Sequence, residues 1–172
     1  EEFGWLRADF SLAIAIQNLA WGIGQPLFSM IAEKYGDRKA IFLGSVLYAV
    51  GLILSSYAVT PLAHQFLEIL IGFGIAGMGF GVILAVIGRT TSEKNRSLAL
   101  GIATSAGSLG QIIGPPVIEN LLQQMPWQEV FMVLAVIVMA SMVLLPMIKS
   151  KTPTAMQGND LSMSEVLGKA LK

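Results

Sequence analysis

Five long apolar runs constrain the fold of this chain more than any other feature. They cover roughly residues 10–31, 40–59, 63–88, 98–120 and 128–148. A helix needs about 20 residues to cross about 30 Å of hydrocarbon. Lipid offers no partner for a bare backbone N–H or C=O, so an open chain crosses it only as helices. We therefore expect an all-α, polytopic transmembrane helix bundle over residues 1–148.

The composition agrees with a bilayer protein and excludes several other classes. The chain is 54% hydrophobic and only 13% charged, whereas soluble domains average about 25% charged residues. The formal net charge is zero, which gives no hint of a nucleic-acid partner. Without cysteine and with a single histidine, His64, the chain offers no thiol chemistry and no histidine metal cluster. We expect no cofactor and no metal.

The basic residues predict the orientation of the bundle. Ten of the eleven Lys and Arg residues lie in the first loop, in the third loop or after the last run, and only Arg7 lies on the other side. Basic residues gather on the cytoplasmic side of membrane proteins. Loops 33–39 and 89–97 and the tail 149–172 should therefore be cytoplasmic, and residues 1–9 should lie outside. We expect an integral, multi-pass protein of a bacterial inner (plasma) membrane.

The two ends of the sequence suggest a piece of a longer protein. The start, EEFGWLRADF, has no initiator Met and no basic segment before an apolar run, so it does not resemble a signal peptide. One further span before residue 1 would place both ends inside and give six helices. The tail 149–172 is polar at first and then reads LSMSEVLGKALK, which is compatible with a short amphipathic helix or with a solvated linker.

The first loop holds an unusual density of charge, in the stretch SMIAEKYGDRK (29–39). A carboxylate at a helix end can pair with basic groups and with a neighbouring helix N-terminus. The stretch resembles the signature between the second and third helices of major facilitator superfamily transporters, Gly-x-Leu-Ala-Asp-Arg/Lys-x-Gly-Arg/Lys-Arg/Lys. The matching positions are Ile31, Ala32, Glu33, Lys34, Gly36 and Arg38.

The resemblance implies a cytoplasmic gate in this loop. In the family this cluster latches the two halves of the transporter when the cytoplasmic side is closed. Glu33 and Arg38 would form the latch, and Gly36 would allow the tight turn. Ser29 stands in place of the leading glycine and Asp37 in place of one basic residue. The alternative is an ordinary positive-inside loop.

The fourth run contains a second motif, GIATSAGSLGQIIGPP (101–116). Gly101, Gly110, Gly114 and Pro115 have the spacing Gly-x8-Gly-x3-Gly-Pro, which resembles the fifth-helix motif of the same superfamily, often associated with antiporters. Its closing Gly-Gly is absent here. Small residues let helices approach closely and proline bends a helix, so we predict a packing face with a hinge. Helix packing alone is the alternative.

The third run is rich in glycine in the segment IGFGIAGMGFG (71–81). GFGIAG matches a dinucleotide-binding pattern formally, but it lies in an apolar span and not in a strand–turn–helix unit. We predict close helix packing instead.

Polar residues inside the runs are candidates for a substrate cavity, because polar groups are costly in hydrocarbon. One set lies in the first run and one in the fourth: Gln17, Asn18, Trp21, Gln25, Ser105, Ser108 and Gln111. Hydrogen bonding between helices is the alternative role for each. Glu68 is the only acid within the third run and a possible coupling acid. We interpret Arg89 as a topological anchor and His64 as an interfacial residue.

These features favour a transporter over an enzyme. The entry EFGWLRADFSLAIAI resembles the monocarboxylate and oxalate/formate antiporter-like branch of the superfamily. The chain would then be most of an N-terminal six-helix half, and the C-terminal six-helix half would lie outside it. The expected function is secondary active transport of small organic anions by alternating access. A drug or sugar efflux transporter of the same superfamily is the runner-up, and a non-transporting membrane assembly protein is the alternative of another class.

Overall fold

The computed structural model describes residues 4–148, and every regular element in that range is helical. The elements are α1 (Arg7–Tyr35), α2 (Asp37–Ser55), α3 (Pro61–Met78), α4 (Phe80–Thr90), α5 (Glu93–Gln124), α6 (Trp127–Ser141) and the 3₁₀ helix η1 (Met142–Met147). The predicted central loop and amphipathic helix, 149–172, lie outside the described residues. The expected all-α bundle is confirmed.

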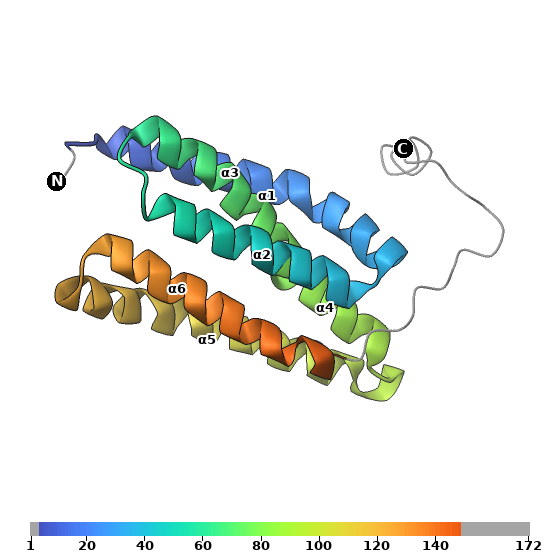
Figure 1. Cartoon of the computed structure of the whole chain (residues 1–172). Coiled ribbons are helices and arrows are strands. Elements are labelled where there is room, and N and C mark those ends of the chain that lie inside the picture. Colours follow the sequence, from blue (N-terminus) through green and yellow to red (C-terminus); the bar gives the residue numbers. More distant parts are fainter. Residues whose placement is uncertain (1–3, 149–172) are drawn as a thin grey trace.

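Successive spans run antiparallel and are joined by short connections, so α1 and α3 run in the same direction (Figure 1). The connections α1–α2 and α4–α5 lie at one end, which we name the Asp37 end after the first residue of α2. The connections α2–α3 and α5–α6 lie at the opposite end, which we name the His64 end. The Asp37 end is the one that the basic residues predict to be cytoplasmic.

Four helical segments of the described chain are long and apolar enough to cross a bilayer. They are Asp37–Ser55, Pro61–Thr90, Glu93–Gln124 and Trp127–Met147. The remaining helix, α1, has 29 residues and is long enough, but its amides Gln17, Asn18 and Gln25 make it less apolar. Helix α1 packs along α3 and belongs to the same bundle (Figure 1).

The third span differs in detail from the sequence expectation, because it is broken at Gly79. This residue is extended, with φ −80° and ψ −174°, and it separates α3 from α4. The sequence predicted one continuous span over 63–88. The local glycine density explains the break, since glycine stabilises a helix interior by about 1 kcal/mol less than alanine does.

The core is built around α3, which lies between α1 and α2, while α6 packs against the other side of α2. Glycines allow this close approach. A Cβ added to Gly44 would come within 2.6 Å of the Gly77 backbone, and one added to Gly24 would come within 2.6 Å of the Ala76 Cβ. Gly72 and Gly74 likewise face the backbones of α1 and α2. The packing role predicted for the glycines of 71–81 is confirmed at these positions.

Helix α5 stands apart from this core. It lies alongside α6 and contacts α4, where a Cβ added to Gly107 would come within 3.0 Å of the Phe80 ring (Figure 1). None of its 32 residues is buried within the described chain. It continues through Pro115 and Pro116 without ending.

Candidate functional site

The turn between α1 and α2 is a single residue, Gly36, with φ 97°. Side chains with a Cβ rarely adopt this conformation, so the turn depends on glycine. The Gly36 N–H donates to the Ala32 carbonyl at 2.9 Å and closes α1. The predicted tight turn at Gly36 is confirmed, and it fixes Asp37 as the first residue of α2.

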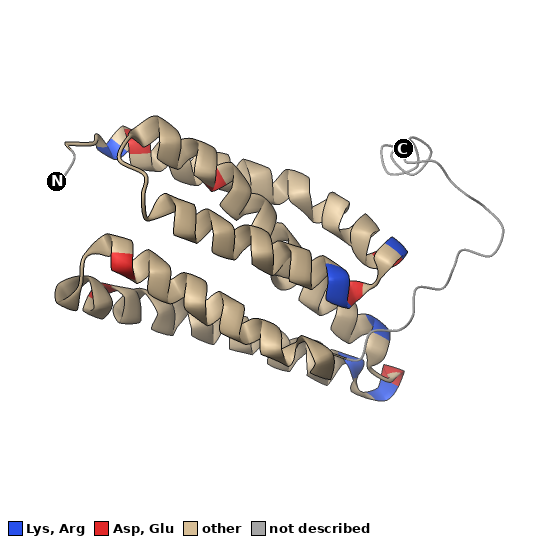
Figure 2. Cartoon of the chain, in the orientation of Figure 1, with Lys and Arg blue, Asp and Glu red and all other residues tan. Residues whose placement is uncertain are grey.

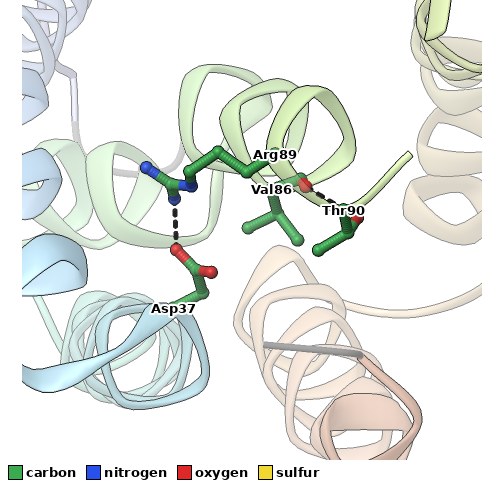
Figure 3. A network of polar contacts seen from close by, with 4 residues as sticks. All are labelled: Asp37, Val86, Arg89 and Thr90. Atoms are coloured by element: carbon green, nitrogen blue, oxygen red, sulfur yellow. Dashed lines mark hydrogen bonds and ion pairs between the residues drawn. The ribbon is translucent and has the colours of Figure 1, made fainter. Parts of the chain in front are cut away.

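Asp37 forms an ion pair with Arg89 (Figure 3). Arg89 reaches from the last turn of α4 and donates through Nη2 to the carboxylate Oδ1 of Asp37. The Asp37 side chain is 6% exposed and that of Arg89 is 41% exposed. The pair therefore ties the start of α2 to the end of the third span, with the acid buried and the base reaching toward the surface.

Arg38 ties the same turn to the end of the last span. Its Nε donates to the Ile148 carbonyl at 2.8 Å, and its Nη2 donates to the Pro146 carbonyl at 3.0 Å. The fixed fork of a guanidinium suits two neighbouring acceptors better than a lysine ammonium does. Together Asp37 and Arg38 join three spans of this chain at one end, and we call these contacts the Asp37 brace.

The other residues of the predicted gate are exposed. Ser29, Glu33, Lys34 and Tyr35 all lie on the surface at the end of α1. Lys34 lies over its neighbour Tyr35, with Nζ 5.4 Å from the ring centre. Within residues 4–148 the Glu33 side chain forms no hydrogen bond or ion pair. The stretch thus divides into a part that contacts other spans, Asp37 and Arg38, and a part that includes Glu33 and makes no such contact among the described residues.

The His64 end holds a second buried acid. Glu68 is 7% exposed, and its Oε1 lies 3.2 Å from the Nε2 of His64, one turn earlier on α3. The other carboxylate oxygen, Oε2, is buried and has no hydrogen-bond partner among the described residues. Trp5 and Phe131 flank the imidazole, with ring centres 5.8 and 6.4 Å away. The sequence interpretation of His64 as an interfacial residue missed this contact with Glu68.

The candidate cavity residues of α1 lie at a helix interface. The Gly72 Cα of α3 faces the backbone at Gln17 and Trp21, and Gly81 of α4 faces the Gln25 amide. Trp21 packs against the core that contains Phe28 and Val82. This placement favours contacts between helices, the alternative that the sequence left open. Asn18 is exposed and donates to the Ile14 carbonyl of its own helix at 2.8 Å.

The candidate residues of α5 have a different environment. Ser105, Ser108 and Gln111 are all exposed in the described chain. A Cβ added to Gly101, Gly110 or Gly114 would meet no described atom within 4 Å. The structure does not bring this face together with the polar face of α1, so both the cavity and the packing motif of α5 stay predictions.

The charges of the described chain gather at the two ends of the bundle (Figure 2). Basic residues lie mainly at the Asp37 end, and Arg7 lies at the other end. Glu68 lies within α3, seven residues after the first residue of that helix. Among residues 4–148 no cluster of three or more His, Cys, Asp or Glu side chains is placed to hold a metal ion.

Sequence reasoning missed the partnership of Arg89, which it treated as an anchor. A signal was available, because alternating spans place the start of α2 and the end of α4 at the same end of the bundle. Asp37 also departs from the family signature by being acidic. An acid at a position where the family has a base suggests a basic partner nearby. Arg89 lies at the end of a neighbouring span and is such a residue.

Comparison with known proteins identifies the family to which the chain is similar. The profile described as "Major Facilitator Superfamily" matches residues 1–168. Among curated proteins, the chain is 36% identical over 120 residues to "Monocarboxylate transporter 13" of Bos taurus, covering 69% of this chain and 26% of that protein.

Two further relatives carry related names. Identity is 35% over 111 residues with "Monocarboxylate transporter 12" of Homo sapiens, covering 63% of this chain and 21% of that protein. It is 28% over 163 residues with "Monocarboxylate transporter 11" of Homo sapiens, covering 90% of this chain and 32% of that protein. The chain therefore spans less than a third of the length of these relatives.

Proposed function

Since the chain belongs to the major facilitator superfamily, we propose that it is the N-terminal part of a secondary active transporter for small organic anions of the monocarboxylate kind. The observation that carries the proposal is the family match over residues 1–168. The names of the relatives, all monocarboxylate transporters, support this substrate class over drugs and sugars. Transport, and not catalysis, is the activity to test.

The proposed mechanism is alternating access around a site near the middle of the membrane. This chain supplies one bundle, and a second six-helix half would supply the other wall of the site. The exposed polar face of α5, with Ser105, Ser108 and Gln111, is the proposed contribution of this chain to the substrate cavity. Hydroxyl and amide groups can bind a carboxylate by hydrogen bonds without a permanent charge.

The orientation belongs to the proposal as well, with the Asp37 end in the cytoplasm. The relatives named above are vertebrate proteins, so they lend no support to the bacterial membrane expected from the sequence. The proposal is therefore an integral membrane location, without assignment to a bacterial membrane.

The test is transport by the natural full-length polypeptide that contains this sequence, reconstituted in liposomes. Uptake or exchange of labelled mono- and dicarboxylates should exceed that of empty liposomes. Transport of sugars or drugs alone would favour the runner-up. No transport of any solute in a broad panel would favour an assembly protein.

The outward part of the gate gives a second, finer test. Glu33 is exposed and has no recorded partner within the described chain, which suits a contact with the other half. Glu33→Ala should slow transport several-fold while membrane insertion stays intact. Glu93→Ala, which removes another exposed acid at the Asp37 end, is the matched control. Equal rates for the two variants would return the Glu33 segment to the status of an ordinary loop.

A further inference from the structure

A small cavity lies near the Asp37 end, where α2, the broken third span and the last span meet. Its volume is about 160 Å³. Met78 and Ile83 line it from the two sides of the break at Gly79. Ile41 lines it from α2, and Leu145 lines it from η1. Three spans of the chain therefore border one space at this end.

The wall of this cavity is apolar. Seven of its nine lining residues are Ile, Leu or Met, and the other two are serines. One of these serines, Ser141, donates its hydroxyl proton to the Val138 carbonyl of its own helix at 2.6 Å. Apolar cavities of about 150 Å³ stay dry and take up molecules of the size of benzene, whereas a buried water needs several polar partners. The cavity therefore suits a segment of hydrocarbon better than water or a polar solute.

The cavity reaches an exposed apolar side of the last span. Leu144 lines it and is 59% exposed, and the preceding residue, Val143, is 77% exposed. Lipid tails are as apolar as leucine, so exposed side chains of this kind on a membrane span suit contact with acyl chains. An acyl chain can therefore enter the cavity from the side of η1.

A cation stands at the Asp37 end of the same cavity. Arg38 precedes Ile41 by three residues and Ser45 by seven, a spacing that places all three on one face of α2. Its guanidinium donates to the carbonyls of Pro146 and Ile148, and Ile148 is also a lining residue. A guanidinium carries five N–H donors, of which these two bonds use two. The other donors are available to an anion at the mouth of the cavity.

The combination of an apolar cavity and an adjacent cation distinguishes between possible occupants. A neutral hydrocarbon would fill the cavity but leave the remaining donors of Arg38 unused. A free phosphate would bind Arg38 but leave the cavity empty. An anionic phospholipid satisfies both, because its phosphate and its acyl chains belong to one molecule. Basic pockets between spans bind anionic headgroups in other membrane proteins.

We propose that this cavity is a binding site for an anionic phospholipid of the leaflet at the Asp37 end. One acyl chain fills the space between α2, the Gly79 break and η1, and the headgroup phosphate accepts hydrogen bonds from Arg38. The bound lipid then reinforces the contact between the start of α2 and the end of the last span. This role is separate from the transport of a solute and does not depend on which solute is carried.

The first experiment measures lipid binding to the natural full-length polypeptide by native mass spectrometry from detergent. Phosphatidylglycerol should half-saturate the protein at a concentration about fivefold lower than phosphatidylcholine does, the ratio that corresponds to about 1 kcal/mol for one basic residue. Arg38→Gln should abolish this preference. Lys94→Gln, which removes another exposed cation at the Asp37 end, should keep it. Equal binding of the two lipids, or an unchanged preference in Arg38→Gln, would overturn the proposal.

The second experiment tests the cavity. Ser141→Phe adds a ring at an exposed position that lines the cavity, and Val143→Phe adds the same ring at an exposed position that does not. Ser141→Phe should weaken the binding of phosphatidylglycerol several-fold, and Val143→Phe should leave it unchanged. Glycerol phosphate, which has the phosphate and no acyl chain, should not compete. Equal binding by the two variants, or competition by glycerol phosphate, would contradict a site for an acyl chain.

The two experiments remain informative when other parts of the account fail. If Arg38→Gln does not insert, the two phenylalanine variants decide, since they leave the contacts of Arg38 in place. Both experiments measure binding alone, so a failure of the proposed transport function would not change their outcome.

Discussion

The two ends of this bundle bury one acid each and give it different partners. At the Asp37 end the partner is Arg89, from a helix that lies 52 residues away in sequence. At the other end the partner of Glu68 is His64, from the same helix, four residues away. An arginine keeps its charge at any pH that the protein meets, whereas a histidine does not.

The difference separates a contact between distant helices from a contact within one helix. The Asp37 brace joins α2 to α4 and η1 through an ion pair and two hydrogen bonds to carbonyls. It should hold these helices together as a unit. Glu68 and His64 lie on the same helix, so their contact joins no helices.

The largest expected effect is the loss of Arg89. Arg89→Ala leaves Asp37 buried without a cation, and breaking such a pair costs about 3–5 kcal/mol. Asp37→Ala should cost less, because the freed guanidinium is 41% exposed and can be solvated. Thermal unfolding in detergent measures both. Equal losses for the two variants would mean that Asp37 is better solvated than its burial indicates.

Neutralising each acid in place gives the sharpest comparison. Asp37→Asn removes the ion pair and should cost about 1–3 kcal/mol, the range for a charged hydrogen bond. Glu68→Gln keeps the size of a side chain whose contact with His64 lies within one helix, so the free energy of unfolding at neutral pH should change by less than about 1 kcal/mol. The measurement is unfolding of both variants in the same detergent. A larger loss for Glu68→Gln would remove the distinction between the two ends.

A smaller effect than the loss of Arg89 is expected at Arg38, whose side chain is exposed but hydrogen-bonds two carbonyls at the end of the last span. Arg38→Ala should lower stability by about 1–2 kcal/mol, since each such hydrogen bond contributes about 1 kcal/mol. Arg38→Lys should recover only part of the loss, because an ammonium lacks the guanidinium fork. Faster limited proteolysis near the end of the last span would report the loss of these hydrogen bonds. Full recovery by lysine would show that charge alone is needed.

Much of the fold was predictable from local pattern. The apolar runs predicted the helices, and Gly36 predicted the turn between α1 and α2. The glycines of the third run gave its close packing. Helix ends were less accurate, because the glycines of 71–81 favour a break but the sequence does not mark Gly79 as its position.

The candidate site was only partly predictable. The segment 33–39 was found from its charge, but the roles of its members were not separable in sequence. From the sequence, Asp37 was a departure from the family signature, yet the structure shows it as the buried charged residue of this segment. The polar residues of α1 read as cavity lining, yet Gln17, Trp21 and Gln25 lie at contacts with α3 and α4.

The sequence by itself determined that this chain forms apolar helices in a membrane and which residues lie near each end. The length of an apolar run and the residue types of a turn are local properties, so they can be recognised in the sequence. Only the tertiary structure decided which charges meet. Asp37 with Arg89, and Arg38 with carbonyls 108 and 110 residues away, depend on how helices from distant parts of the chain pack. Burial of Glu68 is decided in the same way, because His64 is its neighbour along the helix but α1, α2 and α6 exclude the water.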